Sequence, residues 1–232
     1  MTEPVRPEVL ISRLTSDNQS WRADAEARLV SLGEEAVDPL IGALRHANPS
    51  VRIHAVHALA RLRSPRGIAP VIDALADTEN RGAVAIAAEK ALVDWGEPVK
   101  SALLQSVKTG SEAVRARALR ALGKIGGEDL EPSLRAMLAD PLPSIRGQAA
   151  AALGAAIGPR AVEIIAPLLE DSDKWVRYGV AEALVRIGSV RGRDVLEQAR
   201  ADVDEQGTYI RFWADDLLDE IDELHRTGRA IQ

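Results

Sequence analysis

The sequence contains no cysteine, which excludes disulfide bonds, thiolate metal ligands and cysteine nucleophiles. Aromatic residues are scarce as well, at only 3% of the chain. The first residues, Met-Thr-Glu-Pro-Val-Arg-Pro-Glu, lack the basic flank and apolar stretch of a secretory signal, and we expect no later run that approaches the length of a bilayer span. We therefore expect a soluble, cytoplasmic protein that has no membrane as a partner.

What the chain does contain is material for a folded body, with 46% hydrophobic and 28% charged residues among its 232 positions. The formal net charge of −6 argues against a general nucleic-acid binder, because such domains are usually basic. A basic stripe can lie on an acidic body, so nucleic acid stays open as a less favoured partner.

A motif headed by an apolar residue and arginine recurs along the whole chain. Its best copies begin at Val51-Arg52, Val114-Arg115, Ile145-Arg146 and Val176-Arg177, with looser copies at Trp21-Arg22, Val84-Ala85 and Ile210-Arg211. The seven anchors are therefore residues 21, 51, 84, 114, 145, 176 and 210, spaced 30 to 34 residues apart. A near-constant period indicates one supersecondary unit stacked along an axis, so we expect a single repeat domain over residues 1–232.

Each repeat contains two helical patterns, named here helix A and helix B. Helix B has apolar or small residues at the anchor and at offsets of four, eight and eleven, which is the stripe of an amphipathic helix. Helix A carries a recurrent proline, expected near its start or at a kink: Pro39, Pro70, Pro132 and Pro167. Glycines expected to end helix B in a left-handed turn are Gly33, Gly96, Gly126 and Gly188.

These residues resemble a known repeat family. The best copy of its pattern is Leu169-Glu170-Asp171, Val176-Arg177, Ala181, Ala183-Leu184 and Ile187-Gly188. This pattern is similar to the short HEAT-like repeats of phycobilin lyases and of many bacterial scaffold proteins. The resemblance covers nearly the whole chain and implies an all-α fold, a right-handed α-solenoid of about seven antiparallel helix pairs. It identifies no activity, because this fold serves many functions.

In that family, an aspartate in the turn and the arginine early in helix B form a hydrogen-bonded ladder through the stack. The resemblance implies this structural role for Arg22, Arg52, Arg115, Asp140, Arg146, Asp171, Arg177 and Arg211. Asp140 is expected to pair with Arg146, and Asp171 with Arg177, whereas the second and fourth repeats keep only the arginine half. Repeat three has Ala85 in place of the arginine, which predicts an irregular turn.

No catalytic residue, metal or cofactor is expected. The sequence has no Gly-x-Ser-x-Gly elbow, no phosphate-binding Gly-x-x-x-x-Gly-Lys and no His-Glu-x-x-His. The His-Glu pairs that hold iron in deoxyhypusine hydroxylase, a HEAT-repeat enzyme, are also missing from it. His54 and His57 lie three apart on one helix, but two imidazoles without a set of carboxylates make a poor metal site, so we expect an ordinary solvated pair.

The exposed side of the B helices is the expected binding surface. Offsets two, six, nine and ten lie opposite the buried stripe, with offset three on its flank. In solenoids of this family the B helices line the concave face. The candidate partner-binding residues are His54, His57, Arg61, Lys90, Arg117, Arg120, Lys124, Tyr178, Arg186, Phe212 and Trp213. This groove is predicted to be basic in its first half and aromatic and acidic in its last.

Most of the aromatic residues fall in the last two repeats: Trp175, Tyr178, Tyr209, Phe212 and Trp213. Aromatic side chains at a surface are favoured anchors for partners. A terminal repeat must also shield apolar surface from water, so the same residues are equally explained as a cap.

We favour a non-enzymatic protein-interaction scaffold whose concave face binds an acidic or amphipathic segment of a partner protein. The resemblance to phycobilin lyases leaves open a bilin-lyase-like enzyme or enzyme subunit. Nucleic-acid binding through the basic half of the groove is the further alternative.

Overall fold

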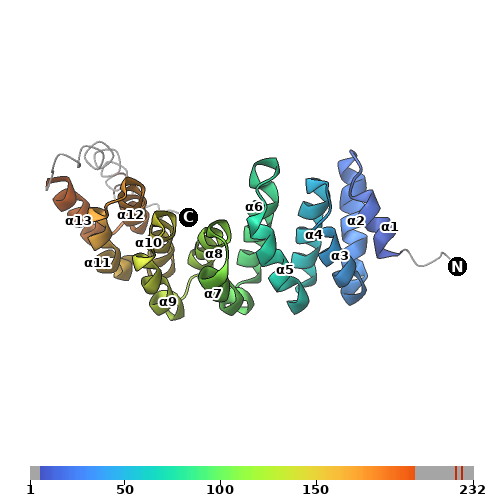
Figure 1. The fold of residues 1–232 in the computed structure, drawn as a ribbon, viewed down its shortest axis with the longest axis horizontal. Coiled ribbons are helices and arrows are strands. Elements are labelled where there is room, and N and C mark those ends of the chain that lie inside the picture. Colours follow the sequence, from blue (N-terminus) through green and yellow to red (C-terminus); the bar gives the residue numbers. More distant parts are fainter. Residues whose placement is uncertain (1–5, 202–222, 224–225, 227–232) are drawn as a thin grey trace. The chain divides into compact units, whose positions relative to one another are not determined.

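The computed structural model describes residues 6–201 together with Glu223 and Arg226, and this part of the chain contains no β-strand. The chain divides into two compact units, Met1–Ala121 and Leu122–Gln232. In their described residues, both units consist of α-helices joined by short 3₁₀ segments, as an all-α solenoid of repeated helix pairs requires (Figure 1). The anchor predicted at residue 210 lies outside the described residues.

The first unit contains the first four repeats. Its elements are α1 (Pro7–Arg13), α2 (Gln19–Ser31), η1 (Gly33–Ala36), α3 (Val37–Ala43), α4 (Pro49–Leu62), η2 (Pro65–Gly67), α5 (Ile68–Asp73), η3 (Ala74–Ala76), η4 (Asn80–Gly82), α6 (Ala83–Trp95), η5 (Glu97–Val99), α7 (Lys100–Thr109) and α8 (Glu112–Ile125), the last of which ends in the second unit.

The second unit continues the same alternation. Its elements are η6 (Glu128–Leu130), α9 (Glu131–Ala136), η7 (Met137–Ala139), α10 (Pro143–Ile157), η8 (Gly158–Ala161), α11 (Val162–Ile165), η9 (Ala166–Glu170), α12 (Lys174–Ile187) and α13 (Val190–Ala201). Within the described residues, the B helices are therefore α2, α4, α6, α8, α10 and α12.

The predicted apolar stripe forms the core. At offset eight, all six described B helices bury a leucine completely: Leu29, Leu59, Leu92, Leu122, Leu153 and Leu184. At offset four, a fully buried alanine or valine stands in each: Ala25, Ala55, Ala88, Ala118, Ala149 and Val180. Burial of these side chains supplies most of the driving force for stacking. The anchor residue of the first repeat, Trp21, does not belong to this core, because it is 65% exposed.

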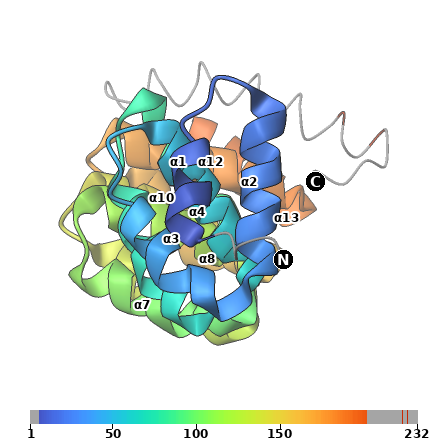
Figure 2. The same cartoon turned by 90° about the vertical axis from the view of Figure 1, so that its right-hand side faces the viewer.

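Consecutive B helices lie side by side within each unit, α2 with α4 and α4 with α6 in the first, α10 with α12 in the second (Figures 1 and 2). Small residues permit this close approach. A Cβ added at Gly179 of α12 would lie 3.8 Å from the Cα of Gly147 in α10. Side chains of consecutive B helices therefore meet within a unit, as His54 of α4 meets Glu26 of α2.

Helix ends follow the sequence signals. Asn18 and Asp173 accept hydrogen bonds from backbone amides in the first turns of α2 and α12. The predicted glycines all have positive φ, between +60° and +73°, and lie at or just after the ends of their helices, although Gly96 has a ψ of −131° and so is not left-handed helical: Gly33, Gly96, Gly126 and Gly188. The recurrent prolines lie in the first turn of α3, α5 and α9, whereas Pro167 lies where α11 passes into η9.

The arginine ladder is present, but it runs one repeat further than the resemblance implied. Arg146 donates through Nε and Nη2 to the carboxylate of Asp171 in the next turn, at 2.7 and 2.8 Å. Through Nη1 it donates to the backbone carbonyl of Asp140 in its own turn. Arg177 likewise donates to the backbone carbonyl of Asp171, not to its carboxylate. The predicted pairs Asp140–Arg146 and Asp171–Arg177 are therefore hydrogen-bonded through the aspartate backbone carbonyls, whereas the carboxylate of Asp171 pairs with the arginine of the preceding repeat.

The second repeat also has an acidic partner, contrary to the prediction. The side chain of Arg52 is only 8% exposed and donates from Nε to Asp77 at 2.8 Å and from Nη2 to Glu79 at 2.5 Å. Its Nη1 donates to two carbonyls of the preceding turn. Arg22 likewise donates through Nη1 to the carbonyl of Ser16 in its own turn, and Arg115 donates through Nε to the carbonyl of Val107 near the end of α7. Arg211 lies outside the described residues.

Repeat three has the irregular turn that Ala85 predicts. Three consecutive residues, Asn80, Arg81 and Gly82, have left-handed φ angles of 48°, 57° and 73°. Arg117 of α8 donates to the backbone carbonyl of Leu75 in this repeat. A guanidinium from the next repeat therefore satisfies a carbonyl where the repeat lacks its own arginine.

The segment Pro143–Glu170 is long and apolar enough, by composition, to span a membrane, with a mean hydropathy of 1.5 in an 18-residue window. The prediction that no run approaches this length was therefore wrong. The chain turns within the segment, because α10 ends at Ile157 and Gly158 has a φ of 57°. The 15 residues of α10 rise only about 22 Å, short of the ~30 Å hydrocarbon core. Its apolar side chains Ile145 and Leu153 are buried in the repeat stack.

Candidate functional site

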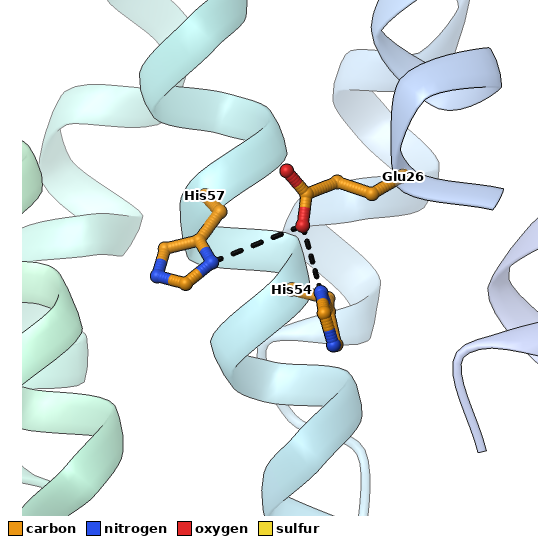
Figure 3. Close-up of side chains that lie close together, drawn as sticks. All are labelled: Glu26, His54 and His57. Atoms are coloured by element: carbon orange, nitrogen blue, oxygen red, sulfur yellow. Dashed lines mark hydrogen bonds and ion pairs between the residues drawn. The ribbon is translucent and has the colours of Figure 1, made fainter. Parts of the chain in front are cut away.

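Three basic or imidazole side chains of α4 converge on one carboxylate of α2. Glu26 lies at offset five of α2 and points to the neighbouring helix, where His54 and His57 stand one turn apart (Figure 3). Its Oε2 lies 2.7 Å from Nδ1 of His54 and 3.8 Å from Nδ1 of His57. Its Oε1 lies 3.5 Å from Nη1 of Arg61, one turn further along α4. The packing of α2 against α4 therefore assembles a polar cluster from two repeats.

Glu26 is held as a carboxylate. Its side chain is only 14% exposed, and this burial raises its pKa. The hydrogen bond from His54 and the contact with His57 outweigh burial and lower the pKa of Glu26 from 4.5 to about 2. The cluster therefore keeps a negative charge beneath its imidazoles at any physiological pH.

The same arrangement recurs between α6 and α8. Glu89, at offset five of α6, accepts a hydrogen bond from Nε of Arg120 at 2.9 Å. The Glu89 side chain is 9% exposed, whereas that of Arg120 is 48% exposed. One residue further along α6, Lys90 pairs with Asp94 at 2.6 Å, and both of these side chains are exposed. This surface pair lies within a single helix.

The exposed sides of α2, α4, α6 and α8 in the first unit thus carry charge in two layers, and we name this surface the B-helix face. Glu26 and Glu89 form the inner layer, with side chains at most 14% exposed. His57, Arg61 and Arg120 form the outer layer, with side chains 46 to 54% exposed. The outer side chains are thus half-exposed to solvent, while one nitrogen of each faces the acid beneath.

This layering corrects the prediction of a simple basic half-groove. Arg117, predicted to bind a partner, is half-buried and donates to a carbonyl of repeat three. Lys124, further along α8, is exposed. The prediction of an ordinary solvated histidine pair was also wrong, because His54 is only 18% exposed and bonded to Glu26.

In the second unit, the described candidates make local contacts. Arg186 pairs with Glu182 on the same helix at 2.6 Å. The rings of Tyr178 and Trp175 meet edge to face, with their centroids 6.4 Å apart. The ammonium of Lys174 lies 5.4 Å from the ring centroid of Trp175. Phe212 and Trp213 lie outside the described residues, so the choice between anchor and cap stays a prediction.

Sequence reasoning missed the two inner glutamates, although a signal for them exists. Glu26 and Glu89 both stand at offset five, in the first and third repeats. A side chain that can pair with them, His57 or Arg120, stands at offset six of the following repeat. The pairing crosses from one repeat to the next, so the pattern within a single helix does not show it.

The cluster at Glu26 contains donors suited to a metal ion. One oxygen of Glu26 and one ring nitrogen from each of His54 and His57 all lie within 4.8 Å of one another. No other group of three such donors occurs among residues 6–201, 223 and 226. The carboxylate that the histidine pair lacks on its own helix comes from the preceding repeat.

Comparisons with known proteins place the chain in a family. No curated protein matches its sequence. Solved structures that resemble it include an archaeal HEAT-like repeat protein from Thermococcus onnurineus NA1, 14% identical, with 96% of this chain and 99% of that one covered and a TM-score of 0.45.

Human deoxyhypusine hydroxylase is 20% identical, with 94% and 96% covered and a TM-score of 0.40. The CpcE and CpcF complex of phycocyanin lyase from Nostoc sp. PCC7120 is 22% identical, with 94% and 97% covered and a TM-score of 0.41. A family model of HEAT repeats matches residues 7–93, 80–146 and 131–214, so the chain belongs to the HEAT-repeat family.

Proposed function

We propose that the chain is a non-enzymatic protein-interaction scaffold and that an acidic segment of a partner protein binds to the B-helix face. The observation that carries the proposal is the layered charge of this face. Its carboxylates are buried beneath and its cations are half-exposed above, so an approaching chain meets the donors first. Family membership supports the general role, because stacked helix repeats present extended binding surfaces.

The inner glutamates make the outer donors better ligands for a partner. A free arginine side chain loses about 2 kcal/mol of rotamer entropy when it is fixed. Arg120 is already positioned by Glu89, so part of this loss has occurred before binding. The same carboxylates reduce the net positive charge of the face, which disfavours a polyanion that depends on charge alone.

The proposal is tested by selecting peptides from a random displayed library on the purified chain. We expect acidic peptides to be enriched, and the double substitution Arg61→Ala and Arg120→Ala to raise their Kd about tenfold, since each half-exposed contact contributes about 0.7 kcal/mol. The matched control is Arg13→Ala with Arg45→Ala, which removes two exposed arginines outside the B helices. Circular dichroism checks that both variants fold.

Three results would overturn the proposal: no enrichment, enrichment of sequences without acidic residues, or equal affinity for both double variants. The alternatives give different outcomes in companion assays. Nucleic-acid binding predicts a gel shift whose affinity falls steeply with salt. A bilin-lyase-like activity predicts a coloured adduct when bilin and an acceptor protein are added.

A further inference from the structure

We propose that Glu26, His54 and His57 form a binding site for a zinc ion on the first unit. The proposal goes beyond the interaction function and does not depend on any partner. It rests on the convergence of two imidazoles and one carboxylate from two helices (Figure 3).

The distances suit a small divalent ion. Zinc bound at about 2.0–2.1 Å in a tetrahedron places neighbouring ligand atoms about 3.3–3.4 Å apart. The Oε2 of Glu26 lies 2.7 Å from one imidazole nitrogen and 3.8 Å from the other. The ion would require the separation from His54 to lengthen and the separation from His57 to shorten, each by about half an ångström. The two ring nitrogens also lie within 4.8 Å of each other, so rotation of the glutamate and imidazole side chains, without movement of either helix backbone, would bring the three donors around one ion.

The chemistry of the donors favours zinc over other common ions. Imidazole nitrogen with carboxylate oxygen is a frequent zinc set, whereas magnesium and calcium prefer oxygen alone. Three protein ligands leave a fourth position for water. The His57 side chain is 46% exposed, so the ion can enter from solvent. The inner carboxylate is 14% exposed, and its charge attracts a cation more strongly there than in bulk water.

Arg61 is the competing cation. Its Nη1 lies 3.5 Å from the second oxygen of Glu26, so the guanidinium and the ion draw on the same carboxylate. The Arg61 side chain is 54% exposed and can turn toward solvent when the ion enters. Removing Arg61 should therefore tighten zinc binding, because the variant lacks a nearby positive charge and leaves the second oxygen of Glu26 without this guanidinium.

The test is isothermal titration calorimetry, in which zinc chloride is added to the tag-free chain. The intact chain should bind about one ion. His57→Ala and Glu26→Gln should each weaken binding at least about tenfold. Arg61→Ala should strengthen it several-fold. His46→Ala and Asp24→Asn are matched controls, because each removes the same functional group on a neighbouring segment and leaves the three donors in place.

The proposal is wrong if the intact chain shows no saturable binding, if His57→Ala binds as tightly as the intact chain, or if His46→Ala causes the same loss. An unchanged affinity in Glu26→Gln would exclude Glu26 as a ligand. His57 is half-exposed, so its variant keeps the fold, which circular dichroism verifies. Failure of this site is distinguishable from failure of the scaffold, because Arg61→Ala acts in opposite directions on zinc and on an acidic peptide.

Discussion

Substituting Arg120 by alanine tests whether an inner carboxylate positions an outer cation. A fully buried ion pair costs about 3–5 kcal/mol to break, and an exposed one costs about 0–1 kcal/mol. Here the carboxylate of Glu89 is 9% exposed and the guanidinium is 48% exposed. We therefore expect Arg120→Ala to lower the free energy of unfolding by about 1–2 kcal/mol, between the two limits.

Urea denaturation followed by circular dichroism measures this difference. The control is Lys90→Ala, which breaks the neighbouring ion pair with Asp94. Both side chains of that pair are exposed, so the variant should lower the free energy of unfolding by less than about 0.5 kcal/mol. The double variant Glu89→Gln with Arg120→Ala should be more stable than Arg120→Ala, because no buried charge then lacks its guanidinium. Equal losses in Arg120→Ala and Lys90→Ala would refute the two-layer description.

Three further predictions concern the repeat stack. Arg52→Ala should lower the free energy of unfolding, measured in urea, by about 3 kcal/mol or more, because it removes a side chain only 8% exposed and leaves its carboxylate and carbonyl partners without that guanidinium. A loss below about 1 kcal/mol would contradict the ladder. The hydrogen bond from Arg146 lowers the pKa of Asp171 against the opposing effect of burial. The ionised Asp171 therefore stabilises the folded chain fully above the ordinary pKa range of a carboxyl group, and this stabilisation is lost as pH falls through the pKa of Asp171 in the folded state. Melting temperatures should thus fall more steeply with acid for the intact chain than for Asp171→Asn, and parallel curves would exclude this role. Gly123→Ala should lower the melting temperature, because its Cβ would lie 2.8 Å from a backbone atom of α10, whereas Gly42→Ala, with open space, should be neutral or stabilising.

The helix pairs and their core were predictable from sequence because they depend on local period. A leucine at offset eight and a small residue at offset four are visible in each copy, and both positions are buried in every described B helix. The irregular turn of repeat three was also predictable, since the replacement of arginine by Ala85 removes a fixed hydrogen-bonding group.

The partners of polar side chains were not predictable by the same means. A long guanidinium or carboxylate reaches across the interface between repeats, and the distance it spans depends on how closely the helices pack. Arg52 and Arg146 both reach an aspartate 25 residues ahead, in the turn of the following repeat. Glu26 likewise pairs with histidines 28 and 31 residues ahead. Comparing equivalent offsets in consecutive repeats would reveal these pairs.

The most direct test of the scaffold proposal is to map the bound peptide on the isotope-labelled chain by nuclear magnetic resonance. With an acidic peptide from the selection, we expect shift changes in the amides of α4, α6 and α8 and in the guanidinium signals of Arg61 and Arg120. The A helices α3, α5 and α7 should be little affected. Changes concentrated on the A helices, or unaltered guanidinium signals at saturation, would contradict binding to the B-helix face.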